Sequence, residues 1–185
     1  MSTKTFLALL ALLLLRLQLF GQEPNIRARC VGVTDGDTVK VLTTDQQLLR
    51  IRLAWIDAPE KGQAFGQRAK QAMSELVFGK EVELRVYGLD KYGRTLATVF
   101  VDDKDVCLEE VRLGYAWVYQ HYIGQAPADI QTSYQQAEIE ARRQRRGLWQ
   151  QENPAPIPPW EYRHPQRSLP PSGEHLNFPR QTWPV

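Results

Sequence analysis

Apolar and polar positions alternate with a period of two from residue 27 onward, the pattern of a β-strand with one buried face. The pattern predicts a strand over 27–34, then two shorter alternating runs, 39–41 and 49–53, on either side of the polar turn 43–46. Pro59 ends the second run, because proline cannot donate to a strand ladder. The two shorter runs are therefore predicted to form an antiparallel hairpin.

Helical spacing replaces the alternation after the hairpin. Apolar residues recur at helical intervals over 64–78, and Gly79 stands where a helix C-terminus is expected, so this segment is predicted to be a helix. Alternation returns over 81–87 and 94–101, which predicts two more strands joined by a loop that contains two glycines.

Two further helices are predicted over 106–113 and 127–146, each followed or ended by a glycine. Acidic residues lie over 102–105, where negative charge suits the positive end of the first helix dipole. The apolar face of the second helix consists of Ile130, Tyr134, Ala137 and Ala141.

Five short strands interleaved with three helices indicate an α+β domain over residues 27–150. Among five-stranded sheets that close on themselves, the OB-type β-barrel is the natural candidate, with its helices on one side. The composition changes after Trp149, since nine of the twelve prolines lie from Pro154 onward. Residues 151–185 are therefore predicted to be an extended, partly polyproline-like tail without helix or central strand.

The first residues of the chain differ from the rest. Lys4 precedes an apolar run over 6–15, and Arg16 and then polar residues follow it, which is typical of an export signal over residues 1–22. We therefore expect an exported protein, periplasmic or secreted. The alternative is that the segment is not cleaved and anchors the protein to a membrane.

The formal net charge of +2 includes Lys4 and Arg16 of this predicted signal, and without them 21 basic residues balance 21 acidic ones. Global charge therefore gives no evidence for binding to nucleic acid, and any attraction to phosphate must be local. Cys30 and Cys107 could form a bridge in an oxidising compartment, but we favour two separate, buried thiols.

The candidate chemistry lies at the two ends of the hairpin. Asp37 begins its first strand and Asp57 ends its second, and an antiparallel pair brings these ends together. Two close carboxylates repel each other unless a cation or a proton lies between them. We expect a hard divalent cation there, with the backbone carbonyl of Ala58 as a third oxygen. Glu60, beyond the rigid Pro59, is placed to take a proton from a water molecule.

Arg52 and Arg94 lie in predicted strands, and each carries a planar fork that matches two phosphate oxygens. Two such forks beside a cation would bind a phosphodiester and stabilise the negative charge that hydrolysis builds on it. Each residue also has an ordinary interpretation. Arg52 could lie on the outer surface of the hairpin, Arg94 could pair with Asp90, and the acids could belong to solvated turns.

Three blocks of the sequence together resemble the staphylococcal nuclease (thermonuclease) family. They are Val33–Val39 with its Asp-Gly-Asp-Thr motif, Arg52–Glu60, and Asp90–Ala97 with its Lys-Tyr-Gly-Arg motif. Their order and spacing match the family, and the resemblance covers about residues 29–149. It implies an OB-type barrel with three helices and calcium-dependent hydrolysis of DNA and RNA that leaves 3′-phosphate ends.

The resemblance also implies residue roles. Ala58 departs from the family pattern, because the type member has threonine there; a backbone carbonyl tolerates this change, although a hydroxyl contact is lost. The implied roles are calcium binding for Asp37, Asp57 and the Ala58 carbonyl, phosphate binding and catalysis for Arg52 and Arg94, general base for Glu60, and nucleotide contact for Tyr92 and Tyr122.

These observations lead to an expected calcium-dependent endonuclease with little sequence preference, monomeric, acting on single-stranded or frayed nucleic acid. One alternative is an OB-type module that binds nucleic acid without cutting it. The presence of both metal acids, both arginines and Glu60 argues for the enzyme. A membrane-tethered scaffold that recruits partners through its tail is a third interpretation, based on composition alone.

Overall fold

The computed structural model describes residues 26–150 and 154–164. The predicted export signal over 1–22 and most of the predicted tail over 151–185 lie outside these ranges. None of the helices within them has the length and apolar character needed to cross a membrane.

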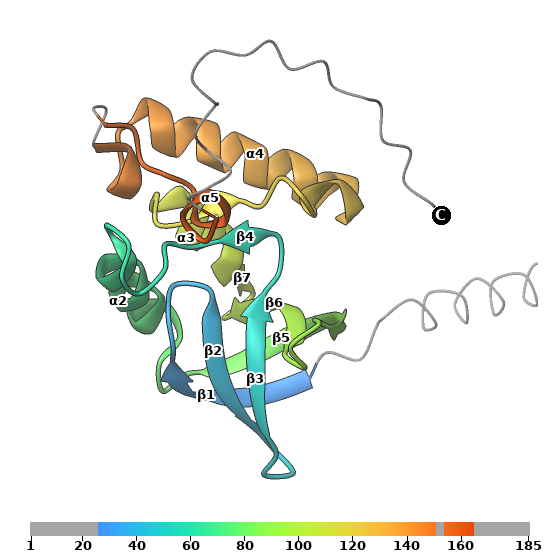
Figure 1. The fold of residues 1–185 in the computed structure, drawn as a ribbon. Coiled ribbons are helices and arrows are strands. Elements are labelled where there is room, and N and C mark those ends of the chain that lie inside the picture. Colours follow the sequence, from blue (N-terminus) through green and yellow to red (C-terminus); the bar gives the residue numbers. More distant parts are fainter. Residues whose placement is uncertain (1–25, 151–153, 165–185) are drawn as a thin grey trace, which may run out of the picture.

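Five strands form a closed barrel (Figure 1). The antiparallel sheet runs in the order β3-β2-β1-β5-β6, and β3 also pairs in parallel with β6, which closes the sheet on itself. This is the predicted α+β, OB-type five-stranded barrel. The strands are β1 (Ile26–Val33), β2 (Thr38–Thr43), β3 (Leu48–Leu53), β5 (Glu81–Leu89) and β6 (Thr95–Val101).

The apolar residues of the alternating strand pattern fill the interior of the barrel. Every second residue of a strand points to the same face, so the apolar set of each strand faces the interior while its polar set faces water. The register of β2 and β3 places both apolar sets on the same side. The fully buried residues that result include Val39, Val41, Ile51, Leu53, Leu84, Ala97 and Val99.

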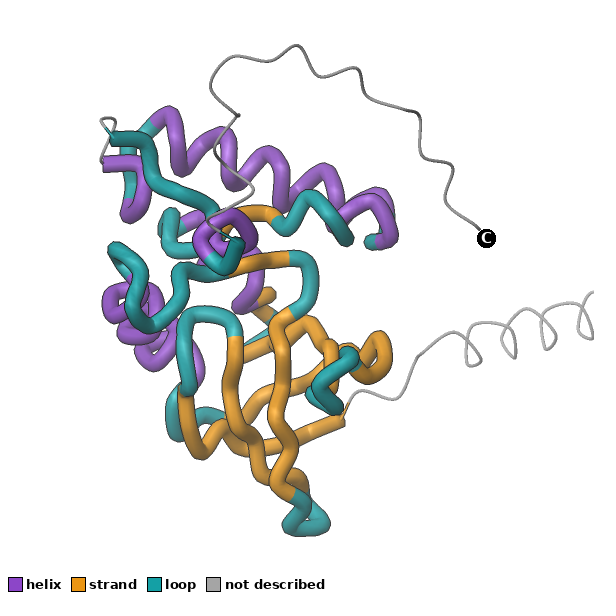
Figure 2. The backbone as a smooth tube through the Cα atoms, viewed as in Figure 1, coloured by secondary structure: helices purple, strands orange, loops and turns teal. Residues whose placement is uncertain are grey.

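Three helices pack beside the barrel, in agreement with the prediction. They are α2 (Gly66–Val77), α3 (Val106–Arg112) and α4 (Ala128–Arg143), and Figure 2 shows the barrel strands in the lower part of the view with α4 above them. The carboxylate of Asp105 begins α3 by accepting a hydrogen bond from the amide of Leu108 at 3.0 Å. The predicted apolar face of α4 is its buried face.

Three short strands and two 3-10 helices complete the domain. These elements are β4 (Ile56–Asp57), β7 (Lys104–Asp105), β8 (Trp117–Val118), η1 (Ile123–Gln125) and η2 (Gly147–Gln150). The chain leaves the barrel after β3 at Trp55, whose φ of 68° turns it sharply. β4 then pairs with β8, so the end of the hairpin is fixed to the segment between α3 and α4.

The prediction that no helix follows Trp149 was wrong. Residues Pro159–Tyr162 form a short helix, α5. Proline is tolerated in the first turn of a helix, where its missing amide hydrogen has no partner in any case, and its fixed φ already suits a helix. The segment packs back on the domain, with the ring of Trp160 stacked on Tyr119 and in edge contact with Trp117.

Both cysteines match their prediction, since Cys30 and Cys107 are buried and free. Burial raises the pKa of each thiol, which keeps the sulfur in its protonated form.

Gly36 allows the turn before β2 to contact both the hairpin end and α2. A Cβ atom at position 36 would lie 2.7 Å from the Cβ of Ala58 and 2.8 Å from the Cβ of Ala69. These methyl groups cannot rotate away because they are attached directly to the backbone. The close approach places Asp37 against the amide of Ala58.

We predict that Gly36→Ala lowers the free energy of unfolding by about 1–3 kcal/mol, because the added methyl group must push the backbone apart. Urea denaturation measures this change. Gly124→Ala is the matched control: nothing lies within 4 Å of its added methyl group, so its stability should equal or slightly exceed that of the wild type. Equal stability of the two variants would contradict the close approach at Gly36.

Candidate active site

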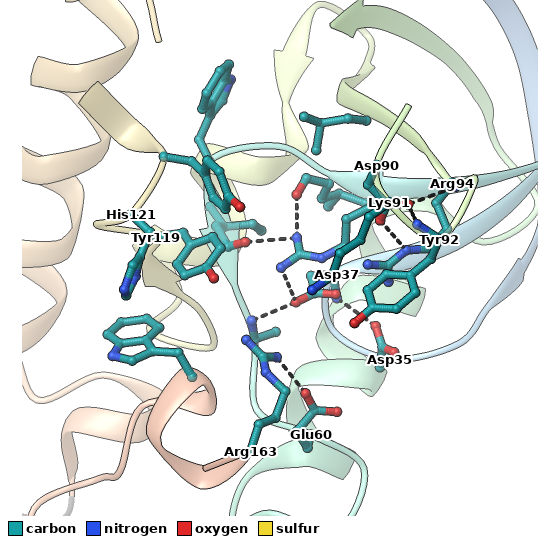
Figure 3. A pocket seen from close by; sticks show the side chains of 18 of the residues that line it. Asp35, Asp37, Glu60, Asp90, Lys91, Tyr92, Arg94, Tyr119, His121 and Arg163 are labelled. Carbon is teal, nitrogen blue, oxygen red and sulfur yellow. Dashed lines mark hydrogen bonds and ion pairs between the residues drawn. The ribbon is translucent and has the colours of Figure 1, made fainter. Parts of the chain in front are cut away.

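A wide cleft of about 1720 Å³ lies between the ends of the hairpin, the loop after β5, the segment after β8 and α5 (Figure 3). The predicted site residues gather at this cleft, although they come from distant parts of the sequence. Asp57 is fully buried beside it. The predicted residues that line the cleft are Asp37, Arg52, Ala58, Glu60, Tyr92, Arg94 and Tyr122.

Asp37 and Asp57 meet at the guanidinium of Arg52. The Nη2 atom of Arg52 lies 2.8 Å from Oδ1 of Asp57 and 3.2 Å from Oδ2 of Asp37. The strand register explains the contact, because Thr38 of β2 is paired with Arg52 of β3 and therefore places Asp37 next to it. One buried cation thus balances carboxylates from both ends of the hairpin.

The bend after β3 fixes the orientation of Arg52. Its Nη1 atom donates hydrogen bonds to the carbonyl oxygens of Leu53 at 2.5 Å and Ile56 at 2.9 Å. Burial by itself would lower the pKa of Arg52, but the carboxylates of Asp37 and Asp57 outweigh burial and raise it. Arg52 is therefore a permanent, rigidly held positive charge.

The carboxylate of Asp37 joins the two ends of the hairpin. Its Oδ2 atom accepts a hydrogen bond from the amide of Ala58 at 2.9 Å, and its Oδ1 atom accepts one from the hydroxyl of Thr38 at 3.0 Å. Asp35, which the sequence prediction did not include in the site, accepts a hydrogen bond from the amide of Asp37 at 3.1 Å and also lines the cleft.

Two carboxyl groups of the site hold their protons more tightly than usual. Burial, followed by the negative charge of Asp37, raises the pKa of Asp57 to about 6, although Arg52 and Arg163 act in the opposite direction. The same two causes raise the pKa of Asp35 to about 6. The carboxylate of Asp37 thus disfavours the charged form of both neighbours, an arrangement that favours positive charge nearby.

Arg94 approaches the acids from the β5–β6 side of the cleft. Its Nε atom donates to Oδ2 of Asp90 at 2.7 Å, so the ordinary pairing considered from sequence does occur. The residue nevertheless faces the cleft, because its Nη1 atom lies 3.4 Å from the hydroxyl of Thr38. Arg52 and Arg94 thus contact the neighbouring residues Asp37 and Thr38.

Glu60 lies in the loop between β4 and α2. Its Oε1 atom is 2.6 Å from Nη1 of Arg163, whose Nη2 atom is also 2.6 Å from Oδ2 of Asp57. Sequence reasoning missed Arg163, because the residue belongs to the segment predicted to be an extended tail. The available signal was the group Trp160–Arg163, a charged and aromatic run within otherwise proline-rich sequence.

Aromatic side chains surround the acids. Tyr92 and Tyr122 are 69% and 51% exposed, so both rings are available to a ligand in the cleft. Tyr92 also lies against the guanidinium of Arg94, with 5.5 Å between the guanidinium carbon and the ring centroid. Tyr119, which was not predicted, lies in contact with Tyr122 and with Trp160.

The side chains match the chemistry of a calcium site, although they are not arranged around an ion. Among residues 26–150 and 154–164, no three Asp, Glu, His or Cys side chains form a group that could hold a metal. However, Asp57 shares one guanidinium with Asp37 and another with Glu60, so each pair already holds a positive charge. Carboxylate and carbonyl oxygens are the donors that calcium prefers.

The chain is similar over most of its length to proteins that are named as nucleases. The family profile described as "Staphylococcal nuclease homologue" matches residues 50–151. An "Uncharacterized endonuclease" of Haemophilus influenzae is 37% identical over 183 residues, 99% of this chain and 94% of the relative. A "Micrococcal nuclease" of Shigella flexneri is 39% identical over 153 residues, 78% of this chain and 84% of the relative. An "Uncharacterized endonuclease" of Escherichia coli is 40% identical over 141 residues, 76% of this chain and 86% of the relative.

We predict that Asp57→Asn gains stability relative to the wild type as the pH rises from 4 to 7 in the presence of a chelator. The folded protein raises the pKa of Asp57 to about 6 from its ordinary value of 3.8, so its protonated form favours folding. That contribution is complete below about pH 4 and is lost as the pH rises through 6. Asparagine does not titrate, so the difference in free energy of unfolding should change by about 1–3 kcal/mol over this range.

Urea denaturation in chelator at several pH values measures this difference. Asp103→Asn, which removes an exposed carboxyl group in the turn between β6 and β7, is the matched control for the substitution itself. Parallel pH profiles for Asp57→Asn and the wild type would show that burial does not raise the pKa of Asp57.

Proposed function

Because the chain belongs to the staphylococcal nuclease family, we propose that this endonuclease depends on calcium, cuts DNA and RNA with little sequence preference and leaves 3′-phosphate ends. The observation that carries the proposal is the convergence of Asp37 and Asp57 on Arg52, with Arg94 beside them at the same cleft. This arrangement supplies oxygen ligands and fixed positive charges at one place.

The dimensions and lining of the cleft support a polymeric substrate. Its volume of about 1720 Å³ exceeds the ~300–1,000 Å³ typical of small-molecule sites. The exposed rings of Tyr92 and Tyr122 can stack on bases without reading their sequence. Stacking requires the face of an unpaired base, so single-stranded or frayed nucleic acid is the expected substrate.

Arg52 and Arg94 are proposed to bind the phosphodiester and stabilise its transition state. Attack by water places additional negative charge on the phosphoryl oxygens, and guanidinium groups held in position lower the energy of that state. Contacts with Asp57 and Asp90 fix the two arginines before substrate arrives. For 3′-phosphate ends, the bond that breaks is the one between phosphorus and the 5′-oxygen.

Glu60 is proposed to accept the proton of the attacking water. It is partly exposed at the cleft and lies on the loop that follows Asp57, so water can reach its carboxylate. Asp37, Asp57 and the carbonyl of Ala58 would hold calcium. When bound, calcium supplies positive charge that polarises the phosphate and lowers the pKa of nearby water.

Export to the periplasm or the medium is also part of the proposal, and residues 1–22 are its only support. N-terminal sequencing of the exported protein tests it: a chain that begins after residue 22 supports a cleaved signal. A membrane-bound chain that retains these residues supports the anchor. We further propose a monomer, since one chain carries every residue assigned to the site.

We predict that single-stranded DNA is degraded in calcium and stays intact in chelator, and that Arg94→Ala lowers the rate about a hundredfold to a thousandfold. The loss follows from removing a positive charge that faces the phosphate. A gel assay with defined oligonucleotides measures both effects. Arg27→Ala, which removes an exposed arginine paired with Glu83, should cut at the wild-type rate. Cutting that survives chelation would contradict the proposed calcium dependence, and binding without cutting would favour a non-catalytic module.

Glu60→Gln should lower the cleavage rate by about a hundredfold or more, because an amide cannot accept the proton of water. The variant should still bind calcium, since Glu60 is not a proposed ligand. Single-turnover kinetics and calorimetry separate these effects. Glu161→Gln, the same change at another residue lining the cleft, is the control and should retain activity. Loss of calcium binding in Glu60→Gln would place Glu60 among the ligands instead.

A further inference from the structure

The segment 158–164 reaches the candidate site through two side chains on one side of α5. Trp160 and Arg163 are three residues apart, a spacing that places them on the same face of a helix. Pro158 and Pro159 restrict the backbone at the start of this turn. Both side chains line the cleft, and Figure 3 shows Arg163 pointing at the acids.

The guanidinium of Arg163 binds the carboxylates of Asp57 and Glu60 on the side that faces the cleft. Its Nη2 atom lies 2.6 Å from Oδ2 of Asp57, and its Nη1 atom lies 3.3 Å from Oδ1 of Asp57 and 2.6 Å from Oε1 of Glu60. Arg52 contacts Asp57 from the inner side. Asp57 therefore has guanidinium groups on both sides, and only Arg163 belongs to a segment outside the barrel.

Trp160 covers an aromatic surface at the same cleft. Its ring stacks on Tyr119, with 5.7 Å between centroids and 24° between planes, and makes an edge contact with His121 at 6.1 Å. A base that stacked on this face of Tyr119 would have to displace the indole. The segment thus occupies both a charged and an aromatic part of the cleft.

Other contacts also hold the segment, among them the edge contact of Trp160 with Trp117 and the burial of Pro159. The hydroxyl of Tyr162 donates to the carbonyl of Gly62 at 3.3 Å, and the side-chain amide of Gln63 donates to the carbonyl of Ile157 at 2.5 Å. The side chains of Arg163 and Glu60 are 37% and 38% exposed, so water screens their ion pair. The ion pair of Arg163 with Asp57 has a fully buried partner and is screened less. No backbone–backbone hydrogen bond joins residues 158–164 to the rest of the described chain, so the segment can leave without breaking a strand or helix of the domain.

We propose that the segment 158–164 is a latch that competes with calcium and nucleic acid for the active site, with Arg163 in the place of the cation and Trp160 on the stacking face of Tyr119. This inference rests on the proposed calcium-dependent activity. The guanidinium of Arg163 lies against both oxygens of Asp57 and against Glu60, so a divalent cation brought to the same side of this carboxylate would meet a positive charge at close range. Calcium binding and docking of the segment are therefore coupled, and each opposes the other to the same extent.

The coupling sets the expected size of the effect. A site that is open in a fraction of molecules shows an apparent affinity reduced by that fraction. A latch closed in about nine molecules of ten thus weakens calcium binding about tenfold. Removing the latch should therefore raise the calcium affinity by the same factor of about ten.

The test compares calcium binding of three full-length proteins by isothermal titration calorimetry. Arg163→Gln should bind calcium about tenfold more tightly than the wild type. Arg143→Gln, which removes an exposed arginine paired with Glu140 on α4, controls for the loss of one positive charge and should match the wild type. Unchanged or weaker calcium binding in Arg163→Gln would overturn the latch.

Trp160→Ala separates release of the segment from a change in charge. This variant keeps the guanidinium of Arg163 but loses the stacking contact with Tyr119, so tighter calcium binding would report undocking. If Arg163 instead contacts substrate as a catalytic group, Arg163→Gln would lose cleavage rate with no gain in calcium affinity, which overturns the proposal.

Limited proteolysis gives a readout that does not depend on activity. Trypsin must bind the side chain of the arginine at which it cuts, and the docked segment holds that of Arg163 against Asp57 and Glu60. Mass spectrometry should show cleavage after Arg163 accelerating in calcium for the wild type, and already fast without calcium for Trp160→Ala. An equal rate of cleavage after Arg163 with and without calcium would contradict release of the segment by calcium.

The outcomes distinguish this inference from the proposed function. Wild-type protein that cuts in calcium, combined with unaltered calcium affinity in Arg163→Gln, would leave the endonuclease intact and remove the latch. Wild-type protein that neither binds calcium nor cuts would overturn both.

Discussion

The buried ion pair of Arg52 with Asp37 and Asp57 is the interaction on which the arrangement of the site depends. Two carboxylates from opposite ends of a hairpin repel each other unless a cation lies between them, and burial increases that repulsion. Arg52 supplies this cation, and its hydrogen bonds to Leu53 and Ile56 hold the bend that carries the chain from the barrel into β4. The same three charged side chains therefore hold the bend in place and form part of the candidate site.

Barrel closure and the β4–β8 pairing bring the remaining groups to these charges. The parallel contact between β3 and β6 places Arg94 beside Thr38, although Arg94 lies more than forty residues beyond Arg52 in sequence. The short pairing of Ile56 with Val118 places the following aromatic segment across the cleft. Each contribution is held by backbone hydrogen bonds, so the side chains are positioned before any ligand arrives.

Much of the fold and part of the site could be predicted from sequence, for identifiable reasons. The alternation of apolar and polar residues indicates which face of a strand is buried, and the hairpin brings Asp37 close to the end of β3. The position of Asp57 depends in addition on the bend at Trp55 and on the pairing of β4 with β8. The contact of Arg163 with Asp57 could not be predicted from the sequence, because it depends on where a distant segment docks. The helix at Pro159 was missed because proline content was taken to exclude a helix, whereas a first-turn position permits one.

The parallel pairing that closes the barrel also bears on how the active site forms during folding. β1, β2 and β3 are joined by local turns, whereas the contact of Ile51 with Thr95 is non-local and must overcome a larger loss of chain entropy. A partly folded chain with only the β1–β3 meander would hold its acids and Arg52 but lack the second arginine. The part of the candidate site that lies in this meander is thus completed only by the ladder between β3 and β6.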